Sequence, residues 1–152
     1  MRSTTVLIAA LAGAPLALAA GAPAPAAPRP ATAAAGTMRN TATLLCLDGN
    51  HAGHVYTLGC NGGRYQQWSR VGGRFGTRFV NAETRRCLDS NAARAVYTLP
   101  CNGGSYQEWD VRQHAFGEEL ANVATGFCLD SNTDGAVYTL ACNGGNFQRW
   151  RP

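Results

Sequence analysis

One set of polar and apolar side chains occurs three times along the chain, at a constant spacing of 41 residues. Each copy has an Asp after Cys-Leu, a Tyr and a Leu within Val-Tyr-Thr-Leu, and an Asn before Gly-Gly. A carboxylate accepts hydrogen bonds and an Asn amide both donates and accepts, so the pair can hold two neighbouring hydroxyl groups. A Tyr and a Leu two residues apart on a strand face the same way and can form an apolar wall. This chemistry suits the hydroxyl and C–H groups of a sugar ring. The alternative is that the Asp caps a turn, the Tyr only packs and the Asn only serves its turn.

The same residues do not form a catalytic set. A glycosidase needs two carboxyl groups within about 5 to 9.5 Å of each other, whereas each Cys-Leu-Asp segment carries one. The three histidines, His51, His54 and His114, have no accompanying nucleophile motif. We therefore predict no catalytic residues and no enzyme activity. A protein-binding inhibitor is the second hypothesis, but such a protein acts through one exposed loop and would not need the polar set three times.

The six cysteines also follow the repeat, and two belong to each copy. An even number of cysteines in a small exported chain is typical of a disulfide framework. The sequence alone allows many pairings, and the symmetry favours one in which each copy closes its own loop. Their spacing is not that of a zinc site, and no carboxylate cluster could supply the oxygens that Ca²⁺ needs, so we predict no metal and no cofactor. The predicted pairs are Cys46–Cys60, Cys87–Cys101 and Cys128–Cys142.

The first 36 residues differ in composition from the rest of the chain. Arg2 precedes an apolar run, and Ala17-Leu18-Ala19 is a cleavage signal, so residues 1–19 are predicted to be a secretory signal peptide. Residues 20–36 are almost only Ala, Pro and Gly, which predicts a disordered linker. Residues 37–152 are then the folded domain of a secreted protein, without membrane insertion.

The charge of the chain is modest and mixed. Without Arg2 and Arg29, 11 of the 13 basic residues remain against 9 acidic ones. Arg85-Arg86 is the only adjacent basic pair, so the sequence has no basic stripe for nucleic acid.

Short apolar runs broken by turn residues recur in each copy, and no helical periodicity is present. Asn-Gly-Gly supplies the positive φ angles of a tight turn, and the whole pattern predicts an all-β fold. Three nearly identical units without caps are better explained by threefold closure than by an open solenoid. The expected architecture is a β-trefoil of three 41-residue repeats with pseudo-threefold symmetry, its core built on Trp68, Trp109 and Trp150.

Gln-x-Trp ends each repeat and Cys-Leu-Asp stands upstream, a pattern that resembles the ricin-B-type lectins. The longer string, Leu-Asp-Ser-Asn through Val-Tyr-Thr-Leu to Cys-Asn-Gly-Gly and Tyr-Gln-x-Trp, is similar to the actinohivin-like lectins and covers residues 38–152. The resemblance implies a secreted, monomeric, trivalent protein that binds high-mannose glycans or glycoproteins, with one pocket per repeat. A module for galactose or xylan is the alternative. The implied pocket residues are Asp48, Tyr56, Leu58, Asn61 and Tyr65 in repeat one, Asp89, Tyr97, Leu99, Asn102 and Tyr106 in repeat two, and Asp130, Tyr138, Leu140, Asn143 and Phe147 in repeat three.

The repeats also differ at positions close to the implied pockets. Phe147 lacks the hydroxyl of its counterparts, which predicts a weaker third site. Arg94 stands where the other repeats have Gly, which predicts a different loop path there. Repeat one has His51 and His54 in that loop, and Gly49 where the other repeats have Ser.

Overall fold

The computed structural model describes residues 34–152. The predicted signal peptide and all but the last three residues of the predicted linker lie outside the described residues. Strand β1 (Gly36–Thr37) begins within the range predicted as linker, because Gly36 pairs with Trp68. The sheet therefore starts one residue before the predicted domain boundary.

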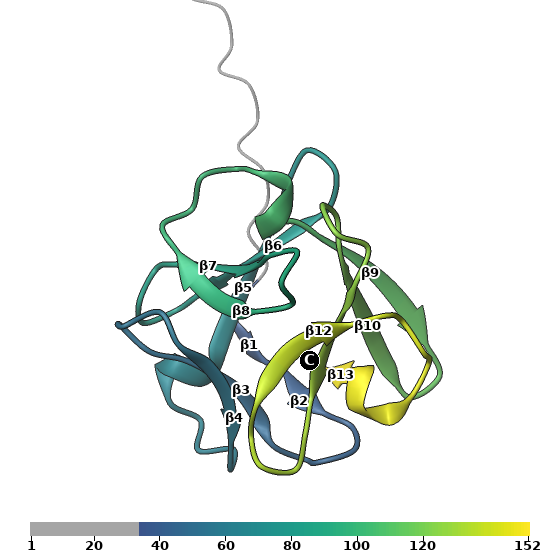
Figure 1. Cartoon of the computed structure of the whole chain (residues 1–152). Helices are drawn as coiled ribbons and strands as arrows, with labels where there is room; N and C mark the ends of the chain where they lie inside the picture. The colour runs from purple at the N-terminus through teal and green to yellow at the C-terminus, as the bar shows by residue number, and fades with distance from the viewer. Residues whose placement is uncertain (1–33) are drawn as a thin grey trace, which may run out of the picture.

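Five strands and the N-terminal segment, which contains two short strands, form a closed antiparallel barrel (Figure 1). Strands β5 (Gln67–Gly72), β6 (Thr77–Asn81), β9 (Trp109–His114), β10 (Gly117–Asn122) and β13 (Trp150–Arg151) pair in that order. The first segment closes the ring, because β1 pairs with β5 while β2 (Arg39–Asn40), one residue further on, pairs with β13. A closed barrel leaves no exposed sheet edge.

Three hairpins extend from the barrel, one per repeat. They are β3 (Cys46–Gly49) with β4 (Val55–Leu58), β7 (Cys87–Ser90) with β8 (Val96–Leu99), and β11 (Cys128–Ser131) with β12 (Val137–Leu140). Each hairpin is followed by a single 3₁₀ turn, η1 (Arg64–Gln66), η2 (Ser105–Gln107) or η3 (Asn146–Gln148). The all-β prediction and the threefold β-trefoil are confirmed. None of the helices among residues 34–152 is long and apolar enough to span a membrane.

The Trp residues of the three Gln-x-Trp motifs form the centre of the core. Each is at most 1% exposed, and each indole N–H donates to the carbonyl of the Leu in Cys-Leu-Asp at 3.0–3.2 Å. A buried indole needs such an acceptor, so the Trp packs the core and fixes the strand that carries the Asp. The prediction that these residues are core residues is confirmed.

The Asn-x-x-Thr turns link each repeat to the one before it. In each turn the Asn side-chain oxygen accepts hydrogen bonds from two backbone N–H groups of its own turn. Its Nδ2 donates at 2.7 Å to the carbonyl of the aromatic residue in the preceding 3₁₀ turn. Asn40 of repeat one bonds in this way to Phe147 of repeat three, so the ends of the chain complete the threefold ring.

The tips of the hairpins meet each other around the pseudo-threefold axis. The backbone N–H groups of Thr57, Thr98 and Thr139 donate to the carbonyls of Gly135, Gly53 and Arg94, at 2.8, 2.8 and 3.0 Å. These three acceptor residues all have positive φ angles, of 86°, 91° and 70°. Arg94 thus follows the same path as its two Gly counterparts, and the prediction of a different loop there is wrong.

The three disulfides are those that the symmetry favours: Cys46–Cys60, Cys87–Cys101 and Cys128–Cys142. Each bond joins the strand that carries the Asp to the residue before the Asn of Asn-Gly-Gly. The covalent link therefore holds two of the predicted site residues in the same region of each repeat.

Candidate functional site

The register of each hairpin brings the predicted Asp and Tyr together. Asp48 lies directly opposite Tyr56, Asp89 opposite Tyr97, and Asp130 opposite Tyr138. Directly opposed residues of an antiparallel pair project on the same face of the sheet and are close enough to interact. The aspartates are 3–5% exposed, so their carboxylates lie at the bottom of the site.

The Gln of each Gln-x-Trp motif positions the other half of the site. In all three repeats the Gln side chain is fully buried. Its side-chain oxygen accepts a hydrogen bond from the backbone N–H of the Asn in Asn-Gly-Gly at 2.9 Å. Its Nε2 donates to the backbone carbonyl of the residue two positions before that Asn at 3.1 Å. In repeat three Gln148 also donates to Asp130 at 2.9 Å. Each Gln therefore holds the Asn-Gly-Gly turn, and Gln148 also connects that turn to the carboxylate at the floor of the site, a role that the sequence reasoning missed.

The Asn of each Asn-Gly-Gly turn uses the two ends of its side chain differently. The oxygens of Asn61, Asn102 and Asn143 accept from the N–H of the second Gly at 2.7–2.8 Å. This bond serves the turn and leaves the NH₂ group as a donor. The turn role and the site role, which the sequence leaves as alternatives, are compatible in one side chain.

A pocket opens at this face in repeats two and three. The repeat-two pocket has a volume of about 250 Å³ and is lined by all five predicted residues of that repeat together with Asn91 and Gly104. The repeat-three pocket has a volume of about 330 Å³ and is lined by its five predicted residues together with Ser131, Asn132 and Gly145. In both pockets an exposed aromatic side chain forms the rim above a buried carboxylate, together with a Leu that is exposed in repeat two and half-buried in repeat three.

Repeat one has the same framework with one different neighbour at the rim. Asp48 faces Tyr56, and Gln66 holds Asn61, as in the other repeats. The imidazole of His51 lies edge-on to the ring of Tyr65, with the ring centroids 5.7 Å apart.

A second Asn, which follows Leu-Asp-x in every repeat, was not among the predicted site residues. Asn91 and Asn132 line the two pockets, and the side-chain oxygens of Asn50, Asn91 and Asn132 accept from the backbone N–H four residues later. Its presence in all three copies is the signal that could have identified it.

Burial raises the pKa of several Asp and Tyr side chains in the site. Desolvation raises the pKa of Asp89 and of Asp130, although hydrogen bonds from Gln and Tyr side chains and from the backbone oppose the shift. Desolvation, together with the nearby Asp, also raises the pKa of Tyr56, Tyr97 and Tyr138. Each Tyr hydroxyl thus stays protonated and can donate a hydrogen bond.

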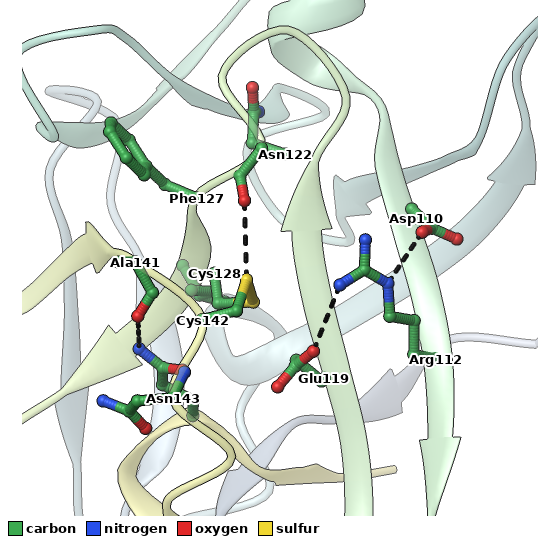
Figure 2. Close-up of a disulfide and its surroundings, with 12 residues drawn as sticks. Asp110, Arg112, Glu119, Asn122, Phe127, Cys128, Ala141, Cys142 and Asn143 are labelled. Atoms are coloured by element: carbon green, nitrogen blue, oxygen red, sulfur yellow. Dashed lines mark hydrogen bonds and ion pairs between the residues drawn. A yellow bond between two sulfur atoms is a disulfide. The ribbon is translucent and has the colours of Figure 1, made fainter.

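One other cluster of potential metal ligands, Glu119 with Cys128 and Cys142, has its atoms already engaged (Figure 2). The two sulfurs are bonded to each other. The carboxylate of Glu119 pairs with Arg149 at 2.9 Å and with Arg112 at 3.4 Å. The disulfide and the ion pairs give these three residues a structural role.

A closed barrel with three hairpins and a polar, aromatic-rimmed pocket is the architecture of a lectin-type β-trefoil. The chain belongs to the ricin-type β-trefoil lectin domain family, whose model matches residues 34–150. This domain is a carbohydrate-binding fold and is not typically catalytic.

Solved structures with the same fold agree with this assignment. The designed 3-fold symmetric protein ThreeFoil is 28% identical with a TM-score of 0.69, and the match covers 76% of this chain and 94% of that one. The hemolytic lectin CEL-III is 25% identical with a TM-score of 0.68 over 81% of this chain and 30% of the lectin. An exo-β-1,3-galactanase from Clostridium thermocellum shares the fold at 21% identity with a TM-score of 0.71, over 78% of this chain and 29% of the enzyme. In the last two proteins the match spans less than a third of a longer chain.

Proposed function

We propose that the protein is a secreted, monomeric, trivalent lectin for high-mannose glycans, with one sugar pocket per repeat and no catalytic activity. The observation that carries the proposal is the pocket of repeat two, where Asp89, Tyr97, Asn102 and Tyr106 converge on about 250 Å³. This volume is near the small end of ligand pockets, as expected of a site for a single sugar ring.

Each residue has a defined role in the proposed site. The buried Asp accepts hydrogen bonds from sugar hydroxyls, the Asn NH₂ donates to them, and the Tyr hydroxyl, which donates to the Asp, can accept from them. The Leu of Val-Tyr-Thr-Leu and the aromatic residue of the 3₁₀ turn cover the C–H face of the ring. Mannose is the proposed sugar because the repeated string resembles the actinohivin-like lectins.

Three pockets on one domain explain why the set is repeated. A shallow pocket for one sugar binds at about the millimolar level, or roughly −4 kcal/mol. Simultaneous contacts with a branched glycan raise the overall affinity by roughly 10² to 10⁴ when the spacing fits. The three weak sites would therefore act together on a glycoprotein.

A glycan array tests this function directly. We expect binding to high-mannose glycans, and EDTA should leave it unchanged because the proposed site uses no metal. Selective binding to galactose- or xylose-terminated glycans would support the alternative module. Simultaneous substitution of Asp48, Asp89 and Asp130 by Ala is the control, and it should abolish binding while the disulfides and the β-type circular dichroism persist.

The absence of catalysis needs a separate assay. Incubation of the protein with the bound oligosaccharide should return it uncleaved. A cleaved product that disappears in the triple Asp variant would contradict the non-enzymatic assignment.

A further inference from the structure

The dipeptide Asn-Gly occurs in each repeat at the same turn, at Asn61-Gly62, Asn102-Gly103 and Asn143-Gly144. All six residues are exposed, and each of these Gly residues has a positive φ of 71–73°. Among residues 34–152, the N–H groups of these three Gly residues donate no hydrogen bond. The Gly nitrogen next to each Asn side chain is thus open to solvent and has no Cβ beside it.

These features favour an intramolecular reaction of the Asn side chain. The Gly nitrogen attacks Cγ of the preceding Asn and forms a new C–N bond, while the Cγ–Nδ2 bond breaks. Ammonia leaves with the proton that the Gly nitrogen gives up. Water then opens the resulting succinimide ring at either carbonyl, which yields aspartate or isoaspartate, so the reaction needs only water.

We propose that the Asn of each Asn-Gly-Gly turn is a site of spontaneous deamidation and that Asn102 reacts first. The attack requires the Asn–Gly peptide to rotate toward the side chain. All three turns must break the same bond between the Asn oxygen and the second Gly N–H, at 2.7–2.8 Å. The order of reaction therefore depends on what else restrains the reacting Gly in each turn.

The carbonyl of the reacting Gly is restrained in two of the three repeats. Gln67 donates to the Gly62 carbonyl at 3.0 Å, and Arg149 donates to the Gly144 carbonyl at 3.4 Å. The equivalent residue in repeat two is Glu108, which has no proton to donate when ionised. Its carboxylate instead accepts from the backbone N–H groups of Arg74 and Phe75, at 2.8 and 2.6 Å. The repeat-two turn is consequently the least restrained.

Deamidation changes the chemistry of the pocket. The Asn102 NH₂, a donor in the repeat-two pocket, is replaced by a carboxylate that shares the pocket with Asp89. Two carboxylates in one site repel each other. Isoaspartate also lengthens the backbone within the turn. The functional part of this inference rests on the proposed sugar site, whereas the chemical part does not.

The chemical part is tested by incubating the intact protein in mildly alkaline buffer and mapping peptides by mass spectrometry over time. We expect the mass increase of amide-to-acid conversion at Asn102 first, and then at Asn61 and Asn143. The internal controls are Asn91 and Asn132, which line the same pockets but precede Ala and Thr. Conversion of these controls as fast as Asn102, or no conversion at any Asn-Gly, would overturn the proposal.

A conservative variant tests whether the hydrogen bond to the Gly carbonyl slows deamidation. Gln67→Glu removes the donor to the Gly62 carbonyl and should raise the rate at Asn61 toward that at Asn102, with the rate at Asn102 unchanged. An unaltered rate at Asn61 would show that the carbonyl bond does not govern the order.

The variant Asn102→Asp tests the consequence for binding. It keeps the oxygen that accepts from Gly104 and replaces the NH₂ group with a second carboxylate oxygen, as deamidation does. Loss of one hydrogen bond corresponds to roughly two- to tenfold weaker sugar binding, and we expect this change in repeat two alone. Unchanged binding alongside confirmed deamidation would reject the pocket role of Asn102 and leave the modification site intact.

Discussion

The Thr98 hydroxyl is buried without a hydrogen-bond partner among residues 34–152, and the cause lies in another repeat. Thr57 pairs with Ser131 at 3.3 Å, and Thr139 pairs with Ser90 at 3.2 Å, across the pseudo-threefold axis. The third pair would join Thr98 to position 49, which is Gly. A Cβ at Gly49 would lie 2.9 Å from Trp68, so the smaller residue fits the present position of that ring.

This difference predicts opposite effects for the same substitution in two repeats. Thr98→Val removes an unpartnered buried hydroxyl and should raise the free energy of unfolding by about 1 kcal/mol. Thr139→Val leaves Ser90 without its partner and should lower the free energy of unfolding by about 1 kcal/mol. Urea denaturation of both variants with the disulfides intact measures this. Equal changes of one sign would show that the broken pair has no energetic effect.

Sugar binding should depend on pH through the buried aspartates. Burial raises the pKa of Asp89 and Asp130 above the ordinary value of 3.8. A carboxyl group with a raised pKa takes up its proton at a higher pH, and the protonated group loses acceptor capacity. Sugar affinity at repeats two and three should therefore fall as the pH decreases, beginning above 3.8. Per-site titrations across acidic pH measure it, and constant affinity down to pH 3.8 would exclude these carboxylates as acceptors.

At the scale of elements, the hairpin tips are held by close backbone contacts. Gly135 has a φ of +86°, and a Cβ there would lie 2.7 Å from the Thr57 carbonyl oxygen. Gly103 has a similar φ of +73°, but a Cβ there would meet nothing within 4 Å. The two positions therefore differ in steric space and not in the sign of φ.

The comparison predicts how Ala substitutions rank. Gly103→Ala should cost only the backbone strain of a left-handed residue, about 1–2 kcal/mol. Gly135→Ala should cost more, because the new methyl group also displaces the carbonyl that faces it. Thermal unfolding of the two variants shows which substitution lowers stability more. A larger loss for Gly103→Ala would show that the hairpin tips are not tightly packed together.

The hairpins and turns illustrate what the sequence can and cannot predict. Short β-type runs, Asn-Gly-Gly and the constant cysteine spacing were sufficient for the all-β fold, the threefold closure and the disulfides. The missing partner of Thr98 was not predictable, because a single sequence does not show which repeats meet on the axis. The buried Gln was overlooked because the hydrogen bonds that it makes in all three repeats are to backbone groups, which the sequence pattern does not reveal. Arg94 misled because a non-Gly residue can adopt a positive φ when its neighbours hold it there.

At the scale of the whole molecule, the threefold fold places the same opposed Asp and Tyr three times on one small domain. The same contacts that close the ring, such as the bond between Asn40 and the Phe147 carbonyl, also fix the rim of a pocket. Stability and site geometry therefore depend on the same residues. This coupling explains why the repeats are so alike in the core and at the pockets.

The proposed avidity makes a prediction about single and combined variants. Asp48→Ala alone should weaken binding to a multivalent glycoprotein without abolishing it, because two pockets remain. Surface plasmon resonance on an immobilised high-mannose glycoprotein measures the change. Complete loss from this single substitution would indicate one dominant site in place of three.

The most direct test is a titration with monovalent mannose, followed by NMR through the backbone amides of Gly63, Gly104 and Gly145. Each of these amides reports on the Asn of one pocket. We expect saturable shifts at all three amides, each with its own millimolar-range affinity, and loss of only the Gly104 response in Asp89→Ala. A response confined to one repeat, or responses that survive removal of the matching Asp, would contradict the claim that each repeat holds its own sugar pocket.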